Sequence, residues 1–186
     1  MWLRLCAASI GIYNTYLAGY PAFKRKNGGD LMQPQTDNPD SLRPDITAEI
    51  MRHTGLNQST LTALVHRFYA KVRADPLLAP IFAEHVQDWD AHLARLVEFW
   101  SSVALMTGRY HGAPVVPHLE MAIGPTHFAR WLTLFRETAA ETCPAAGAAH
   151  LVERAERIAR AFQMAIATHS AEKSNQRKDD AQLRSD

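Results

Sequence analysis

The segment TGRYHGAPVVPHL, from Thr107 to Leu119, decides the fold, because it is a long loop that leads to a histidine, His118, near its end. The part up to Pro117 contains two glycines and two prolines, which are unsuited to the interior of a helix. Helices of an up-and-down bundle are usually joined by about 2–8 plain residues. This loop therefore predicts a structured connection that delivers His118 to a defined place.

Apolar residues recur with a helical period on both sides of this loop. Four helices are predicted, and their apolar faces consist of Leu61, Leu64, Val65, Phe68 and Val72; of Trp89, His92, Leu96, Phe99 and Val103; of Phe128, Trp131, Leu132, Phe135 and Ala139; and of Leu151, Ala155, Ile158, Phe162 and Ile166. No segment alternates with period two for long enough to form a strand. The predicted class is all-α, with a short apolar piece at about 118–123 after the loop.

The polar segments divide the chain into three parts. Residues 24–44 are rich in Gly, Pro, Asn, Asp and Gln, so we expect residues 1–44 to be a poorly ordered extension. The segment 170–186 reads SAEKSNQRKDDAQLRSD and is expected to be a solvated C-terminal tail. The folded domain is therefore predicted to span residues 45–169.

The apolar residues 1–20 could be interpreted as a signal peptide. Arg4 stands nearly alone before the apolar stretch, whereas Lys24, Arg25 and Lys26 follow it, which is the reverse of the usual charge order. We therefore favour a loosely attached extension, or a start upstream of the true one. Met32 and Met51 are the alternative first residues.

Charge and cysteine content exclude several classes of function. The 20 basic and 19 acidic side chains give a net charge of +1, which favours neither nucleic acid nor an anionic membrane as a partner. No apolar run reaches the roughly 18 residues of a membrane span. Cys6 and Cys143 lie too far apart for a metal knuckle or a redox pair, so we expect a reducing compartment, the cytoplasm.

Three polar aromatic side chains fall on or beside apolar helix faces. Tyr69 lies at the edge of the first face, and His92 and Trp131 lie on the second and third. Each alone has an ordinary structural explanation, as does His127 at a helix start. Together they predict an apolar pocket with three converging hydrogen-bonding groups, the kind of pocket that holds a small ligand or cofactor.

Four segments resemble the group III truncated haemoglobins in order and spacing. They are FYAKVRADPLLAPIF (68–82), WDAHLARLVEFW (89–100), TGRYHGAPVVPHL (107–119) and HFARWLTLF (127–135). The resemblance covers roughly residues 57–169 and implies a two-over-two helical sandwich around haem, with a very short F helix.

The resemblance also implies roles for individual residues. His118 corresponds to the proximal iron ligand, and Tyr69 to the B-helix tyrosine that faces an iron-bound ligand. His92 occupies the distal E-helix position, and Trp131 that of the distal G-helix tryptophan. Phe82 corresponds to the phenylalanine that stacks on the haem.

Further residues are weaker candidates by the same resemblance. Leu96 lies one turn beyond the distal histidine and is expected to wall the pocket, while Arg95 is a candidate partner of a haem propionate. Arg109 and Tyr110 are weaker still.

The resemblance implies a monomer that binds dioxygen and related diatomic molecules at a pentacoordinate haem iron. The cofactor is expected to be non-covalent haem b, because the chain has no C-x-x-C-H sequence. Peroxidase-like or nitric oxide dioxygenase activity would require a separate reductase, since no G-x-G-x-x-G motif is present.

Three alternatives to a haem protein compete with this interpretation. A di-iron protein would need Glu-x-x-His pairs, and the sequence has none. A zinc protein could use histidines among His85, His92, His111 and His118, but no cysteine joins them. A structural or partner-binding helical domain would explain the helices but neither the long loop nor the polar pocket residues.

Overall fold

Six α-helices and one short 3₁₀ helix make up residues 39–183, the part of the chain that the structure, a computed structural model, describes. They are α2 (Pro39–Thr54), α3 (Gln58–Ala74), α4 (Ala79–His85), α5 (Trp89–Leu105), η1 (Val116–His118), α6 (Pro125–Thr142) and α7 (Ala145–Leu183). This range contains no strand, which confirms the all-α class. The expectations for residues 1–38 lie outside the described residues.

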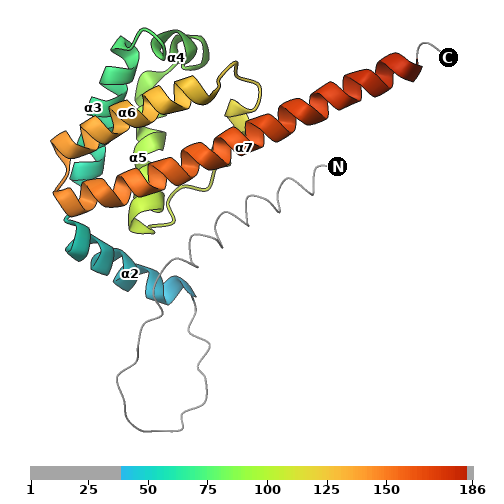
Figure 1. Ribbon diagram of the computed structural model, residues 1–186. Coiled ribbons are helices and arrows are strands. Elements are labelled where there is room, and N and C mark those ends of the chain that lie inside the picture. The colour runs from blue at the N-terminus through green and yellow to red at the C-terminus, as the bar shows by residue number, and fades with distance from the viewer. Residues whose placement is uncertain (1–38, 184–186) are drawn as a thin grey trace, which may run out of the picture. The chain divides into compact units, whose positions relative to one another are not determined.

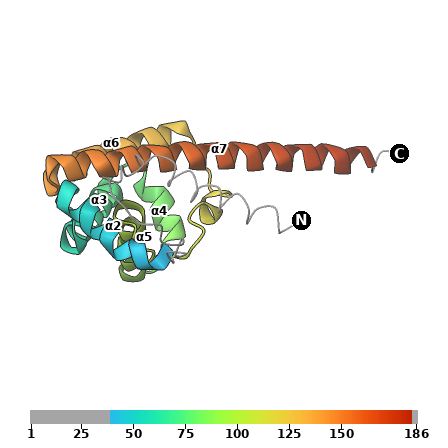
Figure 2. The same cartoon turned by 90° about the horizontal axis from the view of Figure 1, so that it is seen from below.

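The helices pack in two layers. Helices α3 and α5 contact each other, α6 packs along α7, and α6 also crosses α3. Figures 1 and 2 show α6 and α7 side by side over the layer that contains α3 and α5. These are the four helices that the apolar periodicity predicts, in the predicted two-over-two arrangement.

Aromatic side chains fill the contact between the layers. Phe68 of α3, Trp100 of α5 and Phe135 of α6 are at most 1% exposed. The rings of Trp100 and Phe135 stack with their centroids 4.7 Å apart, and Phe68 meets Phe135 edge-on at 5.2 Å. Because each aromatic pair adds about 0.5–1.5 kcal/mol beyond the area that it buries, these contacts hold the two layers in register.

The C-terminal end of α5 is fixed by side chains from neighbouring helices. The last turn of a helix leaves carbonyls without helical partners. Here three of them are satisfied by Arg154 Nε to Val103 O (3.1 Å), His150 Nε2 to Ala104 O (2.8 Å) and Thr47 Oγ1 to Leu105 O (2.7 Å). Met106 then ends the helix in the left-handed conformation, with φ 60°. The loop to His118 thus starts from a rigid point.

The structure differs from the sequence-based expectation around His118. The helical piece expected at about 118–123 is instead η1, which ends at His118. Pro117 suits the first turn of such a helix. Beyond it, Ile123 N–H bonds to Met121 O at 2.8 Å, so the chain turns away towards α6 instead of continuing as a helix.

Helix α7 continues beyond His169, where the folded domain was expected to end, to Leu183. The residues of this extension whose burial is described are mostly exposed, as expected for a solvated segment, but they are helical. The extension contains Ala, Glu, Lys, Gln and Arg, which are residues with a high helix propensity, so a helical conformation is favoured. Glu120 also accepts hydrogen bonds from His169 Nε2 at 2.8 Å and from Lys173 Nζ at 2.5 Å. The domain boundaries at 44 and 169 remain predictions.

Asp75 fixes the junction between α3 and α4. Its side chain is only 2% exposed and accepts hydrogen bonds from the backbone N–H groups of Leu77 and Leu78, both at 3.1 Å. Its other oxygen accepts from Arg130 Nε of α6 at 2.6 Å. Burial raises the pKa of this carboxyl, but Arg130 and the two amides outweigh burial and leave the pKa below its usual value.

We expect Asp75→Ala to lower the free energy of unfolding by about 2–3 kcal/mol, because a buried, charge-assisted network loses its acceptor. A folded-state pKa below the unfolded value of about 3.9 means that the stabilisation is present above that pH and is lost as the pH falls. Urea unfolding at pH 7 and below pH 4 checks this. The exposed Glu137→Ala is the matched control, and an equal loss at both pH values would contradict the prediction.

Candidate functional site

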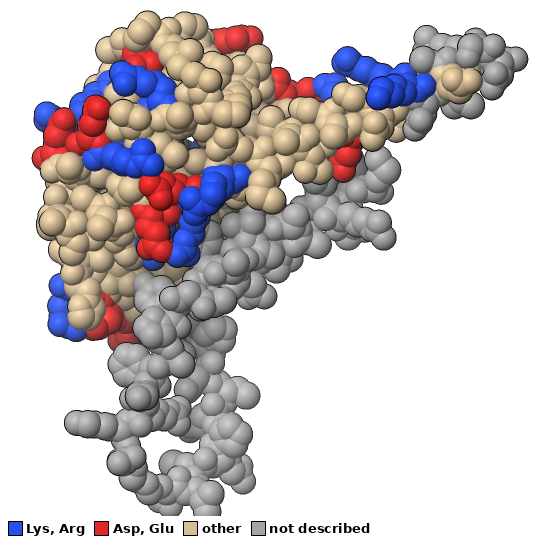
Figure 3. Space-filling view, viewed as in Figure 1, with Lys and Arg blue, Asp and Glu red and all other residues tan. Residues whose placement is uncertain are grey.

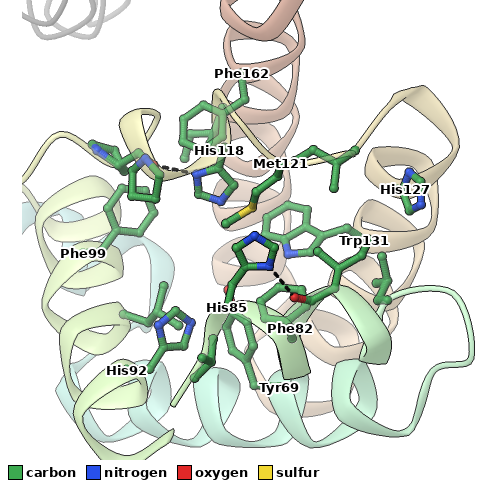
Figure 4. Close-up of a pocket in the computed structure, with 18 of the residues that line it drawn as sticks. Tyr69, Phe82, His85, His92, Phe99, His118, Met121, His127, Trp131 and Phe162 are labelled. Carbon is green, nitrogen blue, oxygen red and sulfur yellow. Dashed lines mark hydrogen bonds between the residues drawn. The ribbon is translucent and has the colours of Figure 1, made fainter. Parts of the chain in front are cut away.

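One cavity of about 330 Å³ lies between the layers, bounded by α3, α4, α5, α6, α7 and the loop that carries His118 (Figure 4). Its volume lies at the lower end of the range for ligand pockets, about 300–1,000 Å³. It brings together all seven predicted site residues: Tyr69, Phe82, His92, Arg95, Leu96, His118 and Trp131. The residues that the sequence predicted to share a pocket therefore do line one cavity, and their roles remain predictions.

His118 enters the cavity from η1 with a fixed ring orientation. Its Nδ1 lies 2.8 Å from Pro114 O, which identifies Nδ1 as the protonated nitrogen of the neutral ring. Phe162 of α7 packs against the imidazole, with the ring centroids 4.9 Å apart. Burial lowers the pKa of His118, the Pro114 carbonyl opposes that shift and His85 adds to it. The neutral ring thus keeps a lone pair on Nε2, as a metal ligand must.

Tyr69 and Trp131 form a polar pair on the opposite wall. Tyr69 is 5% exposed, and burial raises the pKa of its hydroxyl, so the phenol keeps its proton. A hydrogen bond from Trp131 lowers that pKa by less. An indole N–H can only donate, so this interaction leaves the phenol proton for another group. The phenol can therefore donate a hydrogen bond within the cavity.

His92 carries an unsatisfied polar atom at the cavity wall. Its Nε2 is buried and has no hydrogen-bond partner within the described residues. Tyr69 and Trp89 both meet the imidazole edge-on, with ring centroids at 5.8 Å. Burial, followed by the charges of Arg95 and His118, lowers the pKa of His92. A neutral imidazole with one unpaired buried nitrogen suits a site where a ligand supplies the missing partner.

We expect His92→Leu to leave the folding stability of the cofactor-free protein unchanged or slightly higher, because an unpaired buried nitrogen is replaced by an apolar group. Chemical unfolding of the cofactor-free forms of both proteins measures this difference. A loss above about 1 kcal/mol would mean that His92 has a structural partner and that its free nitrogen is not kept for a ligand.

The other predicted residues occupy the edge of the pocket. Phe82 meets Tyr69 at 5.7 Å and stacks on Trp89 at 6.2 Å, so it forms an aromatic wall. Leu96 is half-buried, and Arg95 is exposed where α5 borders the cavity. Of the two weakest candidates, Tyr110 lines the cavity and Arg109 does not. The guanidinium Nη1 of Arg109 lies 4.0 Å from Oε1 of Glu98.

Further residues line the cavity that were not singled out as site residues from the sequence, among them His85, Met121, His127 and Phe162. Phe162 lies on the predicted apolar face of α7, where periodicity cannot separate core from pocket. His127 was interpreted as a helix cap, and its Nδ1 does accept from Gly124 N–H at 3.1 Å. His85 ends a seven-residue helix too short for its facing side to be predicted.

The outer surface offers no competing site of one charge sign on the face that Figure 3 shows. Basic and acidic side chains alternate there, apart from a basic group on the outer part of α7. Within residues 39–183 there is also no group of three or more His, Cys, Asp or Glu side chains that could hold a metal ion. The described part of the chain thus gives the zinc alternative no ligand set.

Haem fits the residues of the cavity. The walls are largely apolar, as a macrocycle requires. His118 offers one oriented imidazole nitrogen, the proximal ligand type of globins, while His92, with its unpaired nitrogen, and Tyr69 line the same cavity.

Comparisons with known proteins agree with this geometry. Residues 52–164 match the model of the bacterial-like globin family. The chain is 36% identical over 93 residues to the group 3 truncated haemoglobin ctb of Campylobacter jejuni, a match that covers 47% of this chain and 73% of that protein. The crystal structure of the group III truncated haemoglobin from Campylobacter jejuni superposes with a TM-score of 0.56 and 33% identity, over 60% of this chain and 91% of that one. The chain therefore belongs to the bacterial-like globins and is a group III truncated haemoglobin.

Proposed function

We propose that the chain binds one non-covalent haem b in this cavity, with His118 Nε2 as the proximal ligand, and that it binds dioxygen and related diatomic molecules there. The observation that carries this proposal is the orientation of His118, whose Nδ1 is held by Pro114 O while Nε2 is left for the cavity. The non-covalent mode is supported by the absence of a C-x-x-C-H sequence.

When bound, haem would supply an iron that can hold a diatomic molecule. The chain's own residues would orient and enclose that molecule. Tyr69 would donate a hydrogen bond from its hydroxyl, Trp131 would interact with the phenol oxygen, and Phe82 and Leu96 would provide apolar walls. Arg95, exposed at the edge of the cavity, is the proposed partner of a haem propionate.

The same donors could polarise an O–O bond, which would give peroxidase-like or nitric oxide dioxygenase activity. Such turnover requires electrons, and a separate reductase is the proposed source because the sequence has no dinucleotide-binding motif. We further propose a cytoplasmic monomer. No helix in the described part of the chain is long and apolar enough to cross a membrane.

Addition of haem to the purified, cofactor-free full-length chain tests the proposal. We expect an intense near-ultraviolet band that saturates at one haem per chain and shifts when carbon monoxide is added to the reduced protein. A chain that binds no haem but binds zinc or non-haem iron, or binds neither, would contradict the proposed function and favour a metal-binding or structural helical domain instead.

A further inference from the structure

The cavity contains a second imidazole that is held in the same way as His118. His85 is the last residue of α4, and its Nδ1 lies 2.8 Å from Ile81 O, a carbonyl of the same helix. Such contacts are ordinary at the end of a helix, but this one also selects the tautomer. With Nδ1 donating to a carbonyl, neutral His85 has its lone pair on Nε2.

This tautomer decides which group His85 can serve. An Nε2 lone pair cannot donate to a carboxylate, so neutral His85 does not suit a haem propionate. It does suit a metal ion, because metal-binding histidines almost always donate their other N–H to a carbonyl, a carboxylate or water. His92 differs, since its buried Nε2 has no hydrogen-bond partner among residues 39–183.

The position of His85 agrees with this chemistry. It lines the same cavity as His118, and Figure 4 shows it between His118 and the pair Tyr69 and Phe82, with its free nitrogen directed towards His118.

Helix α4 can deliver this side chain without disturbing the core. It has seven residues, none of them buried, and the chain becomes extended at Val86 directly after His85. The side chain of His85 is exposed, so its movement breaks no packing contact of the core. Leu78, which precedes α4 and is 2% exposed, anchors its start.

We infer that His85 Nε2 binds the haem iron opposite His118 when no external ligand is present, and that an incoming ligand must displace it. This inference rests on the proposed function and modifies it, because His85 would occupy the ligand position of the iron until an external ligand replaces it. The described residues thus provide a competitor that would slow the binding of every external ligand.

The test compares the haem-loaded full-length chain with His85→Gln, and with His66→Gln as the control, because His66 is exposed and does not line the cavity. Electron paramagnetic resonance and visible absorption of the ferric protein report the coordination state. We expect low-spin, six-coordinate spectra for the original chain and for His66→Gln, and a high-spin spectrum for His85→Gln. If His85 occupies nine-tenths of the molecules, its removal should raise the apparent affinity for cyanide about tenfold.

Two results would overturn the inference. The first is a high-spin, five-coordinate spectrum for the original chain, and the second is a low-spin spectrum that persists in His85→Gln. Both leave the proposed function intact, because haem is bound in each case. A chain that does not bind haem fails the proposed function itself, so the two failures are distinguishable.

Discussion

Replacement of Tyr69 by Phe is expected to speed the release of dioxygen by roughly ten- to a hundredfold. Dioxygen held at haem would take partial negative charge from the iron, and the buried, protonated hydroxyl of Tyr69 lines the same cavity and could donate a hydrogen bond to that charge. A hydrogen bond to a charged acceptor contributes about 1.5–3 kcal/mol, and about 1.4 kcal/mol corresponds to a factor of ten. Stopped-flow measurement of dioxygen dissociation checks the prediction.

Carbon monoxide is the internal control, because its outer atom carries less negative charge and its release should change less. Trp131→Phe should act in the same direction, since the indole orients the Tyr69 hydroxyl. His92 or a water could replace the lost donor, so the variant that combines Tyr69→Phe and Trp131→Phe is the cleaner test. Unchanged release of both gases in all three variants would make these side chains pocket walls only.

The helices that form the sandwich could be predicted from the sequence because their apolar faces are long and regular. The faces that contain Phe68 and Phe135 belong to helices with 17 and 18 residues. In α5 the predicted face is only partly buried, and the fully buried side, which includes Trp100, was not predicted. Many turns repeat the same pattern, so single exceptions such as Tyr69 do not obscure it. Asn57 caps the start of α3, where its side chain accepts a hydrogen bond from Thr60 N–H.

Short or polar elements were not predictable in the same way. Helix α4 has seven residues and no buried side chain. Its sequence therefore has no apolar pattern from which the helix, or the direction of His85, could be predicted. The N-terminal half of α2 lies in a segment rich in Pro, Asn and Asp, which the sequence reading assigned to the extension. The helical extension of α7 lacks an apolar face. The hydrogen bonds of His169 and Lys173 to Glu120 join residues 49 and 53 positions apart in the sequence, so a local pattern does not show them.

The pocket was predicted because polar side chains on three different helices interrupt the apolar faces. From the helical pattern alone, only residues of that kind could be identified. Tyr69, His92 and Trp131 each broke an apolar pattern, which made them visible. Phe162 and Met121 line the same cavity without breaking any pattern, so only their packing in three dimensions identifies them.

Removal of the His118 imidazole should have the largest effect on cofactor binding. Even changes in residues that only orient a metal ligand cost about 10–100-fold in metal affinity, and loss of the ligand itself should cost more. His85 is a poor substitute, because it ends the short helix α4 and lies opposite the proximal element. His92 is also expected on the opposite face. His118→Ala should therefore lose tight haem binding or keep a much weaker, spectrally altered site.

The measurement that tests the central claim most directly is haem titration of His118→Gly with and without added imidazole. The account predicts that affinity falls by more than about a hundredfold and that free imidazole restores the original spectrum, because it can occupy the space left beside Phe162 and Pro114. If His118→Gly instead kept the spectrum and haem affinity of the original chain without imidazole, His118 would not be the proximal ligand and the account would be wrong.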